Sequence, residues 1–283
     1  MADDEWALTR ACCSDGIGNI VSRRRRPPRE TQSAHEARSA RLSDVAGLNV
    51  IDRSSDSVHV ERVWRSEGGD ARRMLSVANS NWELVIVHAR GEVDVVIRGP
   101  ETRTTLVQIP ELEAALGIVF AHGTVMPHLP VGRLVDSAVR ANASVRRVSL
   151  AGDTWELPTF ESAEDLVGRL ARDGLLRRDA LVSEVAAGAD DHGLTVRSVQ
   201  RRVASSTGLT TGAIRQIERA RHAAMLLLSQ VPALDVVHRL GYYDQPHMAR
   251  SLSRFIGRTA TELQRQTDVP LSLLYKTSGW DCS

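Results

Sequence analysis

Two segments of the chain place arginine, glutamine, serine and histidine side chains at helical spacing, opposite an apolar stripe. They lie at about 195–207 and 244–256. Arginine can grip guanine O6 and N7 as a fork, glutamine can grip adenine N6 and N7, and hydroxyls and helix N-termini can hold phosphates. The side chains outside the stripes are therefore candidates for binding DNA: Arg197, Ser198, Gln200, Arg201, Gln245, His247, Arg250, Ser251 and Arg254. Arg258, just after the second segment, is a further candidate as a phosphate contact.

The charge of the chain is divided unevenly, although lysine plus arginine (36) and aspartate plus glutamate (35) nearly balance. From Thr195 to Gln266 there are eleven arginines and four acids, a formal charge of +7, whereas from Val58 to Leu194 fifteen arginines meet twenty acids, a formal −5. Such asymmetry favours contact of the second part with nucleic acid or another anionic surface.

The first basic segment has the signals of a helix. Thr195 is a good N-cap and Gly208 a good stop, so we expect a helix over 196–208. A longer helix, 211–229, should follow it. The expected inward side chains are Val196, Val199 and Val203 in the first helix and Ile214, Ile217, Ala220, Ala224, Leu227 and Leu228 in the second.

The second basic segment repeats this layout. Pro232 should start a short helix, Gly241 should end it with a tight turn, and Asp244 should cap a helix running to about Ile256. A short helix, a glycine turn and an amphipathic helix make a helix-turn-helix. The expected inward residues are Leu234, Val237 and Leu240, then Met248, Leu252 and Phe255.

Residues 195–266 resemble the C-terminal DNA-binding domain of AraC/XylS-family transcriptional regulators. The strings that carry the resemblance are TVRSVQRRV, TGLTTGAIRQIERARHAAMLLL and, more specifically, LGYYDQPHMARSLSRFIGRTATEL. SNWELVIVHARGEVDVVIRGPET and HGTVMPHLP resemble, less specifically, the N-terminal domain of a subgroup of the family. The resemblance implies two helix-turn-helix units bridged by the 211–229 helix, each with one helix in the major groove of double-stranded DNA.

Two features depart from the family pattern. The first unit lacks an obvious scaffold helix before Thr195, so this helix is shortened or merged with the helix expected at 177–188. Asp190 and Asp191 also lie close to the expected position of the DNA, which predicts a smaller contribution from the first unit. Met248 in the second unit is a softer packer than an aromatic side chain would be.

Short β-branched runs between Val58 and about Leu157 indicate an antiparallel sheet or small, cupin-like barrel. Val93, Val95 and Ile97 alternate with polar residues, and Gly91 marks a hairpin turn. The expected fold class is α+β: an antiparallel β domain, then an all-α domain with two helix-turn-helix units joined by a linker helix.

The expected organisation has four parts: a disordered basic and polar extension (1–57), a β-rich regulatory domain (58–160), a helical DNA-binding domain (161–266) and a C-terminal tail (267–283). A chain that is 42% apolar can bury a real core. MADDEWALTR contains acids and no hydrophobic signal-peptide core, and no apolar run is long enough to span a bilayer, so we expect a cytoplasmic protein without membrane contact.

The function expected from these observations is sequence-specific regulation of transcription. No catalytic residue, cofactor or metal is expected. Beside promoter or operator DNA, the family implies as candidate partners a small-molecule effector at the N-terminal domain, a second copy of the chain and, for an activator, RNA polymerase. Trp64, Trp82 and Trp155 are candidates for lining an effector pocket, although core packing is their default interpretation.

An alternative from another class stays open at this point. A cupin-like ligand- or metal-binding protein with a vestigial helical interaction module would use His122 and His128, with Glu111 and Glu113 upstream, as ligands. Pro127 and the neighbouring Pro130 disfavour the extended geometry that would bring the two histidines together, so structural or surface roles are the default for them. DNA titration and metal analysis of the purified protein separate the two hypotheses.

Overall fold

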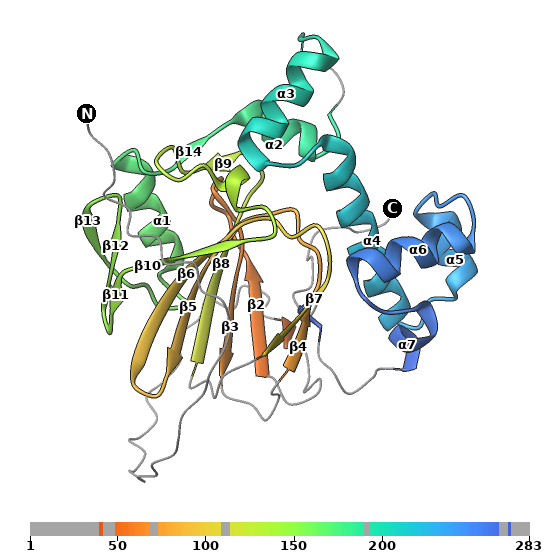
Figure 1. Ribbon diagram of the computed structural model, residues 1–283, viewed down its shortest axis with the longest axis horizontal. Coiled ribbons are helices and arrows are strands. Elements are labelled where there is room, and N and C mark those ends of the chain that lie inside the picture. Colours follow the sequence, from red (N-terminus) through yellow and green to blue (C-terminus); the bar gives the residue numbers. More distant parts are fainter. Residues whose placement is uncertain are drawn as a thin grey trace.

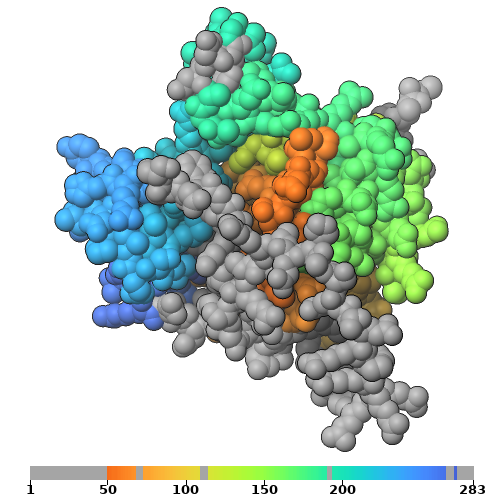
Figure 2. All heavy atoms as spheres, turned by 180° about the vertical axis from the view of Figure 1, so that it is seen from behind, coloured from red at the N-terminus to blue at the C-terminus, as the bar shows by residue number. Residues whose placement is uncertain are grey.

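The computed structural model of the 283-residue chain describes residues 40–41, 49–67, 73–108, 114–189, 193–265 and 271–272. A β-rich part comes first in the chain and a helical part follows it, as Figure 1 shows. Seen from behind in Figure 2, α1 and β11–β13 (green) lie on one side of the molecule and the last helices (blue) on the other. The expected α+β fold class is confirmed.

A seven-stranded antiparallel sheet forms the frame of the β-rich part. Its two edges are β1 and β10, so the described strands form an open sheet rather than a closed barrel. In spatial order the strands are β1 (Ala40–Arg41), β2 (Asn49–Ser54), β3 (Val60–Glu67), β8 (Ala114–Phe120), β5 (Glu83–Ala89), β6 (Glu92–Arg98) and β10 (Ala138–Ala141).

The expected hairpin joins β5 and β6. Ala89 is opposite Glu92, so Arg90 and Gly91 alone make the turn, with φ angles of 54° and 76°. Two consecutive positive φ angles are typical of the type I′ turn, whose twist matches that of paired strands. In β6, Val95 and Ile97 are buried, which confirms the alternation in the sequence.

The β-rich part also contains smaller antiparallel sheets of two or three strands. They are β11 (Ala143–Ser144), β12 (Arg147–Leu150) and β13 (Asp153–Glu156) in one sheet, β4 (Arg73–Ser76) with β7 (Thr105–Gln108), and β9 (Thr124–Val125) with β14 (Arg177–Arg178). A short 3-10 helix, η1 (Val131–Leu134), precedes β10.

The helical part has a long central helix with shorter helices at both ends. Its helices are α2 (Ala180–Ala186), α3 (Val196–Thr207), α4 (Thr211–Leu228), α5 (Ala233–Arg239), α6 (Gln245–Phe255) and α7 (Ala260–Arg265), and α1 (Ala163–Arg172) precedes them in the chain. The expected stripe of α4 is buried except for Leu228, which is half-buried. No helix among the described residues has the length and apolar character needed to cross a bilayer.

Two of the expected domain boundaries differ from the observed packing. The extension expected to be disordered up to residue 57 contains β2, which pairs with β3 over its whole length. Helix α1, which the sequence placed in the DNA-binding part, buries Leu166, Val167 and Leu170 in the core of the large sheet instead. The helical core around α4 includes Val182 of α2 but nothing from α1, so the two parts meet near α2.

The β-rich part and the helical part are in close contact. Arg221 of α4, only 7% exposed, donates a hydrogen bond to the Ala78 carbonyl oxygen at 3.0 Å. The chain also returns to the β-rich part near its end. The Val77 amide donates to Ser272 Oγ at 2.9 Å, and Leu271 bridges Leu75.

Candidate DNA-binding interface

The first helix-turn-helix unit consists of α2 and α3. Thr195 caps α3 as expected, since its side chain accepts a hydrogen bond from the Ser198 amide. Val182 of α2 and Val203 of α3 are buried in the same core. The scaffold helix that was hard to place in the sequence is therefore α2, and Asp190 and Asp191 lie outside the described residues.

The second unit consists of α5 and α6. Asp244 caps α6, and its carboxylate accepts a hydrogen bond from the His247 amide at 2.7 Å. Met248, Leu252 and Phe255 are buried, as the sequence predicted. Both expected recognition helices thus form, each with its apolar side packed on the core around α4.

The two units repeat one another at a fixed offset. The N-caps Thr195 and Asp244 are 49 positions apart, and the same shift relates the buried Val203 and Leu252. It also relates Gly208 and Gly257, the glycines after α3 and α6, with φ angles of 74° and 73°. A positive φ that only glycine adopts easily thus ends the helix at the same place in each unit.

Most of the predicted DNA-binding side chains lie on the outer surface of these helices. Arg201 of α3 and Arg250 of α6 occupy equivalent positions and are both exposed. The other exposed members of the predicted set are Arg197, Gln200, Gln245 and Arg254, and the half-buried ones are Ser198, His247, Ser251 and Arg258.

Two of the half-buried residues also support the turn of the second unit. The Tyr242 hydroxyl donates to Ser251 Oγ at 3.3 Å, and the His247 ring meets the Tyr242 ring edge-on, with 5.4 Å between centroids. Arg219 of α4 lies over the Tyr242 ring at 4.6 Å. Burial raises the pKa of Tyr242, so its hydroxyl stays protonated and able to donate at neutral pH.

Arg202 differs from its neighbours on α3. Its Nε donates to Asp179 Oδ2 at 2.6 Å, and the same carboxylate caps α2. This pair joins the scaffold helix of the first unit to its recognition helix. Arg202 therefore contacts the scaffold helix, although its side chain is 54% exposed and lies at the surface like those of Arg197 and Arg201.

Two expected inward residues are exposed instead. Val196 is 72% exposed and Leu234 is 54% exposed, whereas Val236, which the sequence did not select, is buried. Helical period places Val196 on the apolar side of α3. It is the first residue of that helix, however, and it is not covered by the core. Its equivalent in the second unit is Gln245, one of the predicted base-reading residues.

Sequence reasoning also missed Tyr243, which is 92% exposed beside the N-terminus of α6. Its equivalent in the first unit is Leu194, 50% exposed. The 49-residue repeat aligns these two positions, each just before the cap of a recognition helix, but only the structure shows that both side chains are exposed.

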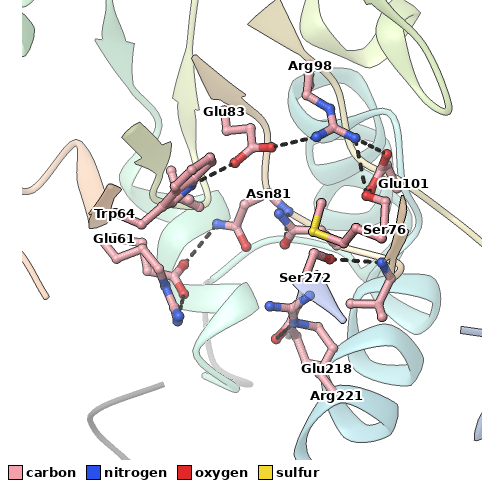
Figure 3. A pocket seen from close by; sticks show the side chains of 15 residues that line it. Glu61, Trp64, Ser76, Asn81, Glu83, Arg98, Glu101, Glu218, Arg221 and Ser272 are labelled. Carbon is pink, nitrogen blue, oxygen red and sulfur yellow. Dashed lines mark hydrogen bonds and ion pairs between the residues drawn. The ribbon is translucent and has the colours of Figure 1, made fainter. Parts of the chain in front are cut away.

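The three tryptophans do not gather around one pocket, although Trp64 lines the polar pocket drawn in Figure 3. Trp82 stacks on Phe120 in the main core, with 3.8 Å between ring centroids, and Trp155 packs at the edge of that core. Trp64 lies on the other side of the sheet, against Gly117. Packing, the default interpretation, therefore accounts for Trp82 and Trp155, whereas Trp64 also donates to Glu83 Oε2 at 3.3 Å in the wall of that pocket.

Among the described residues, the structure groups no set of side chains that would support the metal-binding or enzyme alternatives. Among the residues it describes, no three His, Cys, Asp or Glu side chains are grouped to hold a metal, and Glu111 and Glu113 lie outside those residues. Ser80 Oγ is 2.9 Å from His122 Nε2 and donates to Glu218 Oε1 at 2.5 Å. In a nucleophilic triad the histidine lies between the serine and the acid, whereas here the serine lies between the histidine and the acid. The serine is also only 1% exposed.

The fold and the outer surface define a class: a protein with two helix-turn-helix units at the ends of one bridging helix, the arrangement of a DNA-binding regulator. Residues 188–266 match the model of a helix-turn-helix domain, which is of the AraC type. Residues 188–266 thus carry an AraC-type helix-turn-helix domain, which confirms the resemblance noted for residues 195–266, whereas the resemblance of the upstream strings to an N-terminal domain of the family stays a prediction. Comparisons with curated proteins and with solved structures gave no match.

Proposed function

We propose that this protein regulates transcription by binding a specific DNA sequence with two recognition helices, α3 and α6. The observation that carries the proposal is the 49-residue repeat of cap, buried residue and terminal glycine. It gives each unit a recognition helix with an exposed arginine at the same position.

The length of α4 fits this mode of binding. Its 18 residues span about 27 Å at 1.5 Å per residue. Successive major grooves on one side of B-DNA are about 34–36 Å apart. Units attached at both ends of a helix of this length are suitably spaced for two half-sites one helical turn apart.

Within each unit the proposed roles follow from position. Arg201 and Arg250 would read guanine as bidentate donors, and Gln245 in the first turn of α6 would read adenine. Arg254 and Arg258 would contact phosphates, which give affinity without sequence preference. Arg197, Ser198, Gln200, His247 and Ser251 complete the proposed interface.

A selection experiment tests the function. The full-length protein is incubated with a random duplex library, and the selected and random duplexes are then titrated over a series of salt concentrations. We expect a selected site bound at least about a thousandfold more tightly than random DNA, and affinity for both that falls with salt. Equal affinity for selected and random duplexes would contradict sequence-specific regulation.

We propose in addition that the effector of this regulator binds the β-rich part in a cleft of about 440 Å³ between β3, β8 and the segment 156–161. The volume is in the range of small-molecule sites. The wall of this cleft carries Arg65, Arg146 and His88 together with the carboxylates of Glu67, Glu156 and Glu161, and Arg65 pairs with Glu67 and Glu161. A thermal-shift screen with small polar metabolites, repeated on His88→Ala, tests this location.

A further inference from the structure

Two loops of the β-rich part, residues 99–104 and 130–137, are joined by hydrogen bonds into one unit, which we call the bracket. The amide and hydroxyl of Thr102 donate to the two carboxylate oxygens of Asp136, at 2.7 and 2.6 Å. The Asp136 amide in turn donates to the Pro100 carbonyl oxygen at 2.8 Å. Because these bonds run in both directions, the two loops are held in one arrangement.

The bracket is anchored to the sheet through Glu101. Its carboxylate accepts hydrogen bonds from Arg98 at 2.7 Å and from Ser76 at 2.7 Å, in the polar network drawn in Figure 3. Arg98 also pairs with Glu83, whose pKa is raised by burial. The main chain of Glu101 exchanges two further hydrogen bonds with Asn79. Charge pairing and main-chain bonds thus fix the base of the bracket.

One end of the bracket touches the first helix-turn-helix unit at the glycine that ends α3. A Cβ built on Gly208 would lie 2.6 Å from Gly132 Cα and 2.6 Å from a methyl carbon of Val135. A Cβ built on Gly132 would lie 3.0 Å from the Gly208 nitrogen. A side chain at Gly208 would clash with the bracket, and one at Gly132 would require its neighbour to shift, so the two backbones lie in close contact.

The other end touches the second unit at the equivalent glycine. A Cβ built on Gly257 would lie 2.8 Å from Thr104 Cγ2. The Thr104 amide donates to the Arg254 carbonyl oxygen at 3.3 Å, and just outside the bracket the Ala78 amide donates to the Phe255 carbonyl oxygen at 2.8 Å. The last turn of α6 is therefore tied to the β-rich part.

We propose that the bracket sets the distance and rotation between the two recognition helices, so that the β-rich part fixes the spacing of the DNA half-sites. This inference rests on the proposed function. The bracket holds both units at equivalent points, the C-terminal ends of α3 and α6. The N-terminal turns of both helices stay accessible for base contacts, with Val196 and Gln245 exposed.

The spacing of the half-sites tests the proposal. One added or removed base pair moves a half-site by about 3.4 Å and turns it by about 34°. A protein with rigidly held units should then lose the base contacts of one unit, and its affinity should fall at least about tenfold. Full-length protein is titrated with the selected site and with versions one base pair shorter and longer between the half-sites.

The test variant is Thr104→Gly combined with Asp136→Gly. It removes the contact with Gly257 and the bonds to Thr102, and glycine accepts the φ of 54° found at Asp136. The matched control is Thr104→Val, which keeps the shape of Thr104 and removes only its hydroxyl. That hydroxyl is buried and forms no hydrogen bond within the described part of the chain.

We expect the wild type and the control to discriminate at least about tenfold between spacings, and the loosened variant to bind all three sites within about threefold. Retained discrimination in a loosened variant that melts cooperatively would overturn the proposal. If that variant does not fold, Gly132→Leu replaces it; this wedge should change the preferred spacing, and an unchanged preference would overturn the proposal equally. If the wild type selects no site at all, the proposed function itself fails.

Discussion

Arg250→Ala tests the assignment of α6 as a reader of sequence. The Arg250 side chain is exposed, on the outer side of a helix whose inner side is formed by Met248 and Leu252. It takes part in no ion pair or hydrogen bond found among the described residues. Truncating it should therefore change the free energy of unfolding by no more than about 0.5 kcal/mol.

The effect on DNA binding should be much larger. A bidentate contact between arginine and guanine contributes about 1–3 kcal/mol of discrimination against the wrong base. The dissociation constant for the selected site should consequently rise about 5- to 150-fold. Preference should relax at one or two base pairs of the half-site bound by α6, and the other half-site should be unaffected.

The assay is competition binding with the selected duplex and with duplexes that carry single base-pair changes. Arg254→Ala should weaken binding to selected and random DNA by the same factor, because we assign Arg254 to the backbone. Arg147→Ala, an exposed arginine on β12, should leave binding unchanged. An Arg250→Ala protein that folds normally and keeps the wild-type base preference would refute the assignment.

Three further predictions concern the core, the acid stability and the first unit. Leu227, fully buried in α4, should lose about 2–5 kcal/mol of unfolding free energy as Leu227→Ala in denaturant titration; a loss below about 0.5 kcal/mol would contradict the packing. Burial raises the pKa of Glu164, but the hydrogen bonds from Arg53 and other groups outweigh it and lower the pKa below the ordinary 4.5. The stability from this pair should be complete above pH 4.5 and disappear as the pH falls through the lowered pKa, so Glu164→Gln should flatten the acid limb of a melting-temperature profile. Val196 should contact a thymine methyl, and replacing that thymine with deoxyuridine should weaken wild-type binding about fourfold without affecting Val196→Ser; equal sensitivity of both proteins would contradict this role.

Much of the DNA-binding part could be predicted because its signals are local. N-caps such as Asp244 and terminal glycines such as Gly208 act through the nearest backbone groups, and both lie where the sequence placed them. The inward residues of α6 follow from helical period. In the β-rich part the Arg90–Gly91 turn is equally local, since two positive φ angles suffice to define it.

The sequence-based predictions that were wrong concern which secondary-structure elements pack against one another. Period shows that a helix has an apolar side but not where its partner ends, so Val196 and Leu234 were expected to be buried and are exposed. The apolar stripe of α1 is the same whether it packs on a sheet or on helices, and the sequence therefore assigned α1 to the wrong part. Contacts between distant backbones, such as Gly132 with Gly208, leave no periodic pattern at all.

Hydroxyl-radical footprinting of the full-length protein on its selected site tests the central claim most directly. Two recognition helices at the ends of α4 should protect two patches on the same side of the duplex, centred about one helical turn, or 10–10.5 base pairs, apart. Arg201→Ala and Arg250→Ala should each weaken a different patch. A single protected patch, or two patches that both respond to the same substitution, would contradict binding by two separate helix-turn-helix units.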